Sequence, residues 1–306
     1  MLSGAGPEVV VGVGDDAAVV ASGAGQLVLS TDSMVEGTHF SRATTSARDL
    51  GYKAIVVNVS DIAAMAASPR FALCALTLSE GVDAAWTIEL FGGMREACNE
   101  YALWLVGGNL ARGSEVSVSV TVTGEVAPGR AVKRSGAEPG DRIVVTGSLG
   151  GAAAGLRVAQ RAGPPKDGDR PLLHSLFRPV ARVGEAAILA RHGATAMIDS
   201  SDGFSLDLSR VCSASGVGAR IMLAEIPVAA GATLEEALGG GEDYELVATL
   251  ADGDAVSSAR AEMNESLGVA LTEIGAIVEG AGVTAVDADA ERALEPTGWD
   301  HFALPG

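Results

Sequence analysis

The stretch Asn58-Val-Ser-Asp-Ile-Ala-Ala-Met65 (NVSDIAAM) places an aspartate in the middle of an apolar segment with small neighbours. The pattern predicts a helix over residues 46–67, because Ser46 and Asp49 resemble a capping box and a Ser-Pro dipeptide follows the segment. An aspartate is rarely buried unless it is paired. We therefore expect Asp61 to face a partner or a cation.

Further acidic clusters occur along the whole chain, mostly after strand-like runs or glycine turns. Two like charges about 4 Å apart repel by about 1 kcal/mol in water, and by more in a partly buried site. A fold that gathers these carboxylates needs a cation, and oxygen ligands suit Mg²⁺ or Ca²⁺, with Mg²⁺ commonly serving substrate phosphates. The clusters read GVGDDAAVV (Gly12–Val20), STDSMVEGTHF (Ser30–Phe40), GGN (Gly107–Asn109), IDSSDG (Ile198–Gly203) and GGEDYEL (Gly240–Leu246).

The composition excludes several classes of function. The 306 residues suffice for two domains, and the net charge of −18 argues against non-specific binding to nucleic acid or to anionic membranes. A phosphate substrate stays open, because metal ions invert the local charge. The three cysteines form no CxxC pair, and no secretory signal or membrane-spanning run is evident, so a cytoplasmic protein with reduced thiols is expected.

Strand-like and helix-like segments mix in both halves, which predicts an α/β (α+β) fold. The turn-rich run Arg134–Asp141 indicates a boundary between an N-terminal domain, 1–134, and a C-terminal domain, 135–306. We expect strands at 26–30, 115–123, 142–146 and 196–198, helices at 83–101, 180–192 and 205–213, and a Gly/Ala-rich loop followed by a helix within 147–158. The first strand is expected to enter a polar loop at Ser30-Thr31-Asp32.

Each cluster taken alone also has an ordinary explanation. Asp32 and Asp202 suit helix caps or turns, and Glu242-Asp243 suits a loop. A lone histidine such as His39 is more often an ordinary half-exposed residue, and Trp299 could simply cover a core edge. The chain has no GxxxxGK[ST], HExxH or GxSxG motif and only three lysines. Metals and arginine would therefore have to hold any nucleotide.

The order of the motifs closely resembles the thiamine-monophosphate kinase family. This family belongs to the superfamily of aminoimidazole ribonucleotide synthetase, selenophosphate synthetase and the hydrogenase maturation ATP-hydrolase. The resemblance runs from Gly12 to Phe302 and rests on GDD, STD, GTHF, NVSDIAAM, RSGAEPGD, SDG, GGEDYEL and GWDHF. It implies two α/β domains, a homodimer formed through the N-terminal sheets, and ATP-dependent phosphorylation of thiamine monophosphate to thiamine diphosphate on several Mg²⁺ ions.

The resemblance also implies a role for individual residues. Asp61, Asp199 and Arg134 are the expected catalytic residues, in a direct in-line transfer without a phosphoenzyme. Gly108, Arg134 and Ser201 fall on ATP-binding positions, and His39, Glu242 and Trp299 fall on substrate positions. The positions of metal ligands are Asp16, Ser30, Thr31, Asp32, Asp61, Asn109, Asp199 and Asp202.

Four features depart from the family pattern. Only about a dozen residues precede the GDD turn, and Asn109 stands where the family has aspartate, which removes one negative charge and predicts weaker metal binding there. Ala66 replaces a usual glycine, and Ser200 replaces a commonly apolar residue. The first two departures keep a second hypothesis open, an inactive nucleotide- or metal-binding homologue. A third hypothesis is another ATP-dependent synthetase of the superfamily. Selenophosphate synthetases usually carry a reactive cysteine near the N-terminus, and no cysteine precedes Cys74 in this chain.

Overall fold

The computed structural model describes residues 9–11, 15–16, 18–22, 25–288 and 290–299. The chain forms two compact units. Unit 1 contains the described residues up to Ala131 together with Phe177–Val183, and unit 2 contains Val132–Leu176 and the described residues from Gly184 onward. No sequence signal predicted that the short segment Phe177–Val183 belongs to unit 1.

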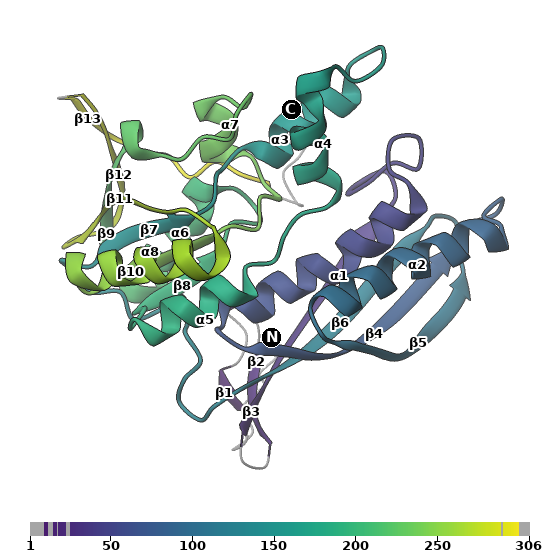
Figure 1. The fold of residues 1–306 in the computed structure, drawn as a ribbon, viewed down its shortest axis with the longest axis horizontal. Coiled ribbons are helices and arrows are strands. Elements are labelled where there is room, and N and C mark those ends of the chain that lie inside the picture. The colour runs from purple at the N-terminus through teal and green to yellow at the C-terminus, as the bar shows by residue number, and fades with distance from the viewer. Residues whose placement is uncertain (1–8, 12–14, 17, 23–24, 289, 300–306) are drawn as a thin grey trace. The chain divides into compact units, whose positions relative to one another are not determined.

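Unit 1 is a six-stranded sheet with the helices α1 and α2 on one face (Figure 1). The strand order is β1-β2-β3-β6-β4-β5, and only the pair β4–β5 is parallel. The strands are β1 (Val9–Val11), β2 (Ala18–Ser22), β3 (Gly25–Val35), β4 (Ser68–Leu78), β5 (Trp104–Arg112) and β6 (Ser117–Val126).

The helix predicted from NVSDIAAM is α1 (Ala47–Ala64), and its side chains are buried along almost its whole length. Ser46 caps its first turn by accepting the Asp49 N–H at 3.0 Å. The helix ends before the predicted Ala67, because Ala66 takes a left-handed backbone with φ 55°. Helix α2 (Ala84–Glu100) matches its prediction, and Asp83 caps it.

The predicted loop at Ser30-Thr31-Asp32 is wrong, since β3 continues through these residues. The partner strand β6 pairs with β3 over this whole stretch, and local polarity does not outweigh that pairing. Side chains alternate between the two faces of a strand. Ser30 and Asp32 lie opposite Val122 and Val120, which are fully buried, so both polar residues share the face that the helices cover.

Unit 2 is a mixed seven-stranded sheet in the order β13-β12-β9-β11-β7-β10-β8, in which only the pair β12–β9 is parallel. Its strands are β7 (Arg142–Thr146), β8 (Ala196–Asp199), β9 (Gly218–Met222), β10 (Leu246–Leu250), β11 (Leu271–Val278), β12 (Gly282–Asp287) and β13 (Ala290–Ala293). The helices are α3 (Gly151–Gln160), α4 (Arg170–Phe177), α5 (Val183–Arg191), α6 (Phe204–Ser215), α7 (Leu234–Gly239) and α8 (Gly253–Leu267), with short 3₁₀ turns at Asp167–Asp169 and Leu223–Glu225.

The core of unit 2 forms where α6 packs on the sheet. Phe204 and Leu208 of α6 are fully buried in one apolar cluster with Ile198 of β8, Ile221 of β9 and Ala285 of β12. This packing places the start of α6 directly after the strand that ends in Asp199, so the IDSSDG motif forms the turn between them.

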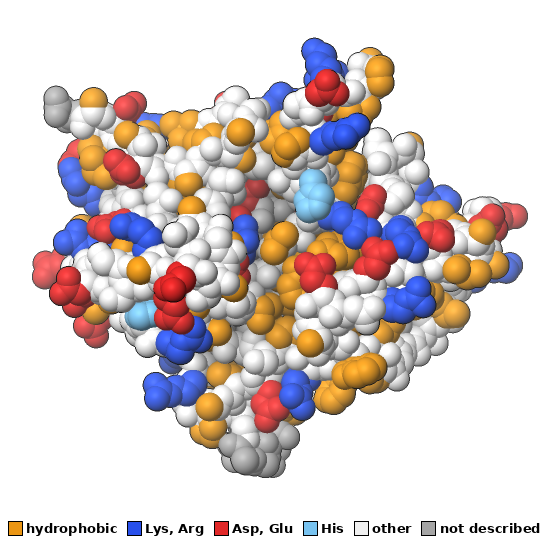
Figure 2. All heavy atoms as spheres, viewed as in Figure 1, with side chains coloured by type: hydrophobic (Ala, Val, Ile, Leu, Met, Phe, Trp, Pro, Cys, Tyr) orange, Lys and Arg blue, Asp and Glu red, His pale blue; other side chains and the backbone are white. Residues whose placement is uncertain are grey.

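On the face drawn in Figure 2, the described acidic and basic side chains are interspersed over the surface and do not gather by sign. Among the described residues, no helix is long and apolar enough to span a membrane. Cys74, Cys98 and Cys212 are all buried free thiols.

Candidate metal and phosphate site

In unit 1, three of the predicted metal ligands come together. Ser30 on β3 donates a hydrogen bond from Oγ to the carboxylate of Asp61 on α1, and its Oγ lies 3.4 Å from the main-chain oxygen of Asp16. One carboxylate oxygen of Asp16 and one of Asp61 lie within 4.8 Å of each other. Two carboxylates and a hydroxyl are an oxygen-only donor set, which fits Mg²⁺ better than a transition metal.

Asn58 holds this arrangement in place. Its side chain is buried one helical turn before Asp61, where Nδ2 donates to the Ala54 carbonyl at 3.0 Å and Oδ1 accepts the Asp32 N–H at 2.9 Å. The amide therefore joins α1 to β3 beside the predicted ligands. The sequence pattern already places Ala54, Asn58 and Asp61 on one helix face, and this spacing is the signal that identifies Asn58 as part of the site.

The side chain of Thr31 does not join Ser30 and Asp61. Strand alternation turns it to the uncovered face of the sheet, where its Oγ1 donates to the Val120 carbonyl and lies 3.0 Å from Thr121 Oγ1. The expected ligand role of the Thr31 hydroxyl therefore has no support in this geometry.

Asn109 is also separated from the carboxylates within one chain. Its neighbour Gly108 on β5 aligns with Asp32 through Cys74 and Val120, across three strand-to-strand steps. At about 4.8 Å a step the separation is about 14 Å. Asp32 and Asn109 of the same chain therefore cannot bind one Mg²⁺, whose ligands lie about 2.1 Å from the ion.

Gly108 has a packing reason for being glycine. A Cβ atom at this position would lie 1.8 Å from the Cys74 carbonyl oxygen of the neighbouring strand. Gly108 and Asn109 also border an open pocket of about 410 Å³, which is lined by Cys74, Phe91, Leu105, Val106, Gly107, Gly108, Asn109 and Leu110. The predicted nucleotide residue thus lines a pocket in addition to permitting the β4–β5 pairing.

His39 has a clear local role in the turn that follows β3. Its Nδ1 accepts the Val35 N–H at 3.0 Å, while its own N–H donates to the Val35 carbonyl at 2.9 Å. Because Nδ1 accepts a hydrogen bond, the neutral ring carries its proton on Nε2. The half-buried ring is therefore fixed in orientation, as a residue that recognises a substrate should be.

In unit 2, the predicted metal, nucleotide and acceptor residues meet on a single turn. Asp199 ends β8 with 1% exposure. The carbonyl of Ser201 accepts the Glu242 N–H at 2.7 Å, and the carbonyl of Asp202 accepts the Trp299 N–H at 2.8 Å. The turn Ser200–Gly203 thus joins the GGEDYEL loop and the C-terminal segment through main-chain bonds.

Asp207 organises this turn from the first turns of α6. Its Oδ2 accepts the N–H groups of Ser201, Asp202 and Gly203 at 3.1, 3.2 and 3.1 Å. Arg210 bridges the two acids, bonding Asp207 Oδ1 at 2.6 Å and Asp202 Oδ2 at 2.7 Å. Burial raises the pKa of Asp207 to about 7, and the charge of Arg210 opposes the shift. Neither Asp207 nor Arg210 was predicted as a site residue, although their i, i+3 spacing just after SDG would have indicated that the two side chains lie on one helix face.

Asp243 anchors the GGEDYEL loop in a similar way. Its carboxylate accepts the Gly150 N–H at 2.6 Å and the Ala152 N–H at 3.1 Å, at the start of α3. Burial raises its pKa to about 7, the two N–H groups lower it, and the charge of Glu245 raises it. The flanking residues Glu242 and Tyr244 have positive φ angles of 71° and 54°. This strained loop is held in one conformation by its aspartate.

Arg134 lies in unit 2 beside the strand that leads to Asp199. The carbonyl of Lys133 accepts the Met197 N–H of β8 at 2.9 Å, and the Arg134 carbonyl accepts Ser215 Oγ at 3.2 Å. The main chain of Arg134 is thereby fixed next to β8. A guanidinium at this place suits an anionic ligand at the end of the strand.

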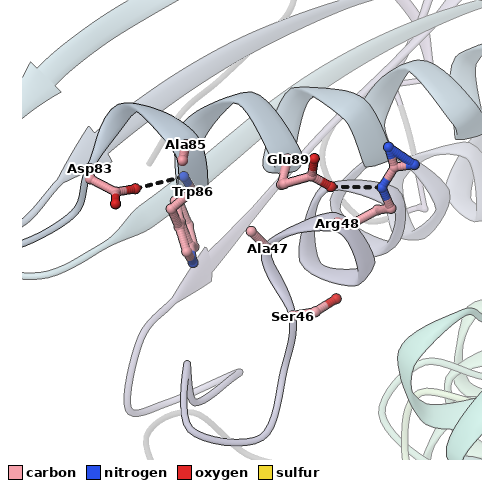
Figure 3. Close-up of a pocket in the computed structure, with 7 residues that line it drawn as sticks. All are labelled: Ser46, Ala47, Arg48, Asp83, Ala85, Trp86 and Glu89. Carbon is pink, nitrogen blue, oxygen red and sulfur yellow. Dashed lines mark hydrogen bonds and ion pairs between the residues drawn. The ribbon is translucent and has the colours of Figure 1, made fainter.

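A further pocket of about 380 Å³ lies in unit 1 between the first turns of α1 and α2. Figure 3 shows its lining, including the ion pair between Arg48 Nε and Glu89 Oε2 at 2.9 Å. None of its lining residues, Ser46, Ala47, Arg48, Asp83, Ala85, Trp86 and Glu89, belongs to the predicted site.

Known proteins resemble the chain over nearly its full length. Residues 14–126 match the family AIR synthase related protein, N-terminal domain, and residues 138–288 match the corresponding C-terminal domain. Thiamine-monophosphate kinase of Escherichia coli O157:H7 is 39% identical, covering 97% of this chain and 94% of the relative. Thiamine-monophosphate kinase of Bacillus subtilis is 33% identical, covering 95% and 93%.

Solved structures agree with this similarity. The structure described as AaThiL complexed with AMPPCP and TMP has a TM-score of 0.84 at 32% identity, covering 95% of this chain and 92% of the other. Thiamine-monophosphate kinase from Stenotrophomonas maltophilia has a TM-score of 0.81 at 35% identity, covering 91% of each chain. Hydrogenase maturation protein HypE in complex with ATP, at 20% identity and a TM-score of 0.75, shares the fold.

Proposed function

The chain belongs to the thiamine-monophosphate kinase family, and we propose that it transfers the γ-phosphoryl group of ATP to thiamine monophosphate on Mg²⁺ held by its aspartates. ATP-dependent phosphorylation of thiamine monophosphate to thiamine diphosphate is the activity of this family. The observation that carries the metal proposal is the meeting of Asp16, Ser30 and Asp61 in unit 1.

Asp16, Asp32 and Asp61, with the Ser30 hydroxyl, are the ligands that unit 1 offers. Asp199 and Asp202 are those of unit 2. Bound Mg²⁺ would neutralise the charge of the phosphates that come together in the reaction. Asn58 and Asp207 keep the two sets of ligands oriented, the first through the Asp32 N–H and the second through the N–H groups of the turn Ser200–Gly203.

The residues of the chain contribute to the reaction mainly by positioning the two substrates, and only little by proton transfer. A phosphate monoester is already largely ionised near pH 7, because its second pKa is about 6. The attacking oxygen therefore needs little help from a general base, and alignment with charge neutralisation dominates the rate. Arg134 is the cation proposed for the ATP phosphates, and Ser201 and the pocket at Gly108 are proposed to contact the nucleotide.

The acceptor is proposed to bind at Glu242, Trp299 and His39. Trp299 is half exposed, so its indole face is accessible to a ligand. Stacking of a cationic ring on an indole contributes about 0.5 to 2 kcal/mol. Glu242 adds a negative charge beside the same turn, which suits the cationic thiamine ring system. His39 presents an orientated ring with its proton on Nε2.

The chain is further proposed to act as a homodimer through the uncovered face of the unit 1 sheet. Phe71, Leu73 and Trp104 are 45%, 49% and 71% exposed there, while Ala72 and Cys74, which alternate with them along β4, are buried under the helices. Large apolar side chains gathered on one face mark an interaction surface. A cytoplasmic location, expected from the cysteines, stays a prediction.

The decisive experiment replaces Asp61 and measures ADP release with ATP, Mg²⁺ and thiamine monophosphate. Asp61→Ala and Asp61→Asn should lower turnover at least about a hundredfold, while far-UV circular dichroism stays that of the wild type. Glu80→Gln, an exposed acid in the turn between β4 and α2, is the control. Near wild-type turnover of Asp61→Ala would remove the metal proposal.

The same assay separates the alternative functions. Formylglycinamidine ribonucleotide and selenide, offered in place of thiamine monophosphate, should not stimulate ADP release. Nucleotide binding without ADP formation would instead identify an inactive homologue.

A further inference from the structure

A buried hydroxyl in α6 holds the C-terminal segment of unit 2. Ser205 is 1% exposed and lies in the first turn of the helix, just after the turn Ser200–Gly203. Its Oγ accepts the Thr297 N–H at 3.0 Å and lies 2.9 Å from the Thr297 carbonyl oxygen and 3.1 Å from its Oγ1. One serine thus satisfies the main-chain donor of Thr297 and can donate to either Thr297 oxygen.

The residues that follow Thr297 fit closely against the same turn. Gly298 has no room for a side chain, because a Cβ atom would lie 2.5 Å from the Asp202 carbonyl oxygen. Trp299 then donates its N–H to that carbonyl at 2.8 Å. The segment Thr297–Trp299 is itself exposed. Its position therefore depends on these few polar bonds and on little burial of its own.

We propose that Ser205 is a positioning residue that fixes the segment Thr297–Trp299 and thereby sets the affinity for the acceptor substrate. The proposal rests on the acceptor role proposed for Trp299. Without the hydroxyl, the Thr297 N–H can still reach water, so the main effect is a loosened segment and not a damaged core. A loosened segment presents the Trp299 indole in many orientations, and ordering it on binding then opposes acceptor binding.

Ser205→Ala is the primary test. Loss of a buried hydrogen-bonding group should raise KM for thiamine monophosphate about 3- to 10-fold. KM for ATP and kcat should stay within about twofold, because the metal and nucleotide residues keep their own hydrogen bonds. Ser209→Ala is the matched control, since its Oγ bonds only the Leu206 carbonyl in the same helix among the bonds described. It should leave all three constants unchanged.

A further variant tests the same segment from its other side. Gly298→Ala keeps Ser205 but forces the segment away from Asp202, and it should raise KM for thiamine monophosphate in the same way. Calorimetric titration of thiamine monophosphate into each variant gives a readout that does not depend on turnover. Equal affinities for the wild type and Ser205→Ala would overturn the proposal.

Trp299→Ala separates this proposal from the function on which it rests. If Trp299→Ala weakens acceptor binding and Ser205→Ala does not, the positioning role is wrong and the acceptor role stands. If neither weakens it, the acceptor role of Trp299 falls and this inference falls with it. If both do, Ser205→Ala should add little in the Trp299→Ala background, because the two residues act as one unit.

Discussion

Ala66 is an alanine at a position where the family usually has glycine, and its backbone conformation lowers the stability of the fold. It follows the helix cap Met65 with φ 55°, and the N–H groups of Ala66 and Ala67 bond the carbonyls of Ala63 and Ile62 at 2.7 and 3.1 Å. These two bonds form a Schellman motif, in which the left-handed residue is usually glycine. The resemblance places a glycine at this position, and the backbone gives the physical reason for it.

Ala66→Gly should therefore stabilise the protein by about 0.5 to 1 kcal/mol. Glycine relieves the left-handed strain, although its freer unfolded chain cancels part of the gain. Urea unfolding followed by circular dichroism measures the change. Ala63→Gly, inside the buried helix, is the matched control and should lose about 1 kcal/mol or more. An unchanged or lower stability of Ala66→Gly would contradict this explanation of the turn.

The raised pKa of Asp243 predicts how the stability of the folded protein depends on pH. Its pKa is raised by burial to about 7 in the folded protein, whereas an unfolded aspartate has a pKa of about 3.9. Between these two values the folded state holds a proton that the unfolded state has released. The unfolding free energy contributed by this group therefore falls as the pH rises from about 4 to 7, and it is constant above that.

Replacing Asp243 with asparagine removes this titration while keeping an acceptor for α3. The stability of Asp243→Asn relative to the wild type should rise by up to about 4 kcal/mol across this pH range. Urea unfolding of both proteins at several pH values measures it. Parallel stability curves would show that the carboxylate does not carry the predicted shift.

The residues of the site were predictable to the extent that they stand in polar motifs. Asp61 was found because an aspartate in an apolar helix needs a partner, and its bond from Ser30 confirms that it has one. Asn58, Ser205 and Asp207 were given no role in the site from the sequence alone. They act on main-chain groups that only the tertiary fold brings near, as the three N–H groups at Asp207 illustrate.

At the scale of elements, local pattern predicted the helices and strands whose signals are continuous. The alternation of Val116, Val118, Val120 and Val122, all fully buried, predicted β6 correctly. The predicted end of β3 was wrong, because the strand continues for as long as its partner strand β6 pairs with it. Helix α4 was not predicted, since its few apolar residues, such as Leu172 and Leu176, follow a turn-rich stretch.

The parallel pair β4–β5 depends on one glycine. A Cβ atom at position 108 would lie 1.8 Å from the Cys74 carbonyl oxygen, so Gly108→Ala must push the edge strand away. We expect a loss of about 2 to 4 kcal/mol in unfolding free energy, measured by urea unfolding. Gly107→Ala is the matched control, because its Cβ would approach only Leu73 Cδ2, at 3.3 Å. Equal effects of the two substitutions would contradict the close approach.

At the scale of the whole molecule, the two-domain organisation was evident from the motifs, but the course of the chain was not. Phe177–Val183 belongs to unit 1 because Arg178 bonds Asp49 at 2.7 Å and Glu96 at 2.8 Å and lies 4.5 Å over the ring of Tyr52. These partners lie about eighty to 130 residues earlier in the chain. Sequence patterns that act over a few residues cannot anticipate such a return.

The proposed dimer predicts that a charge placed on the uncovered face of the unit 1 sheet will separate the two chains. Leu73 is 49% exposed on the uncovered face of the sheet, so an arginine there has little effect on the folding of a single chain. In a dimer that covers this face, the same arginine would be buried without a partner, which costs several kcal/mol. Leu73→Arg should therefore convert a particle of about twice 30.7 kDa into one of 30.7 kDa.

Sedimentation or light scattering measures this mass directly. Ile88→Arg is the matched control, because Ile88 is 68% exposed but lies on α2, on the helical side of the sheet. It should leave the dimer intact. A wild-type monomer, or a Leu73→Arg variant that stays dimeric, would contradict an interface on this face. Loss of the dimer in Ile88→Arg but not in Leu73→Arg would place the interface on the helical side, because an added charge disrupts association only where it is covered.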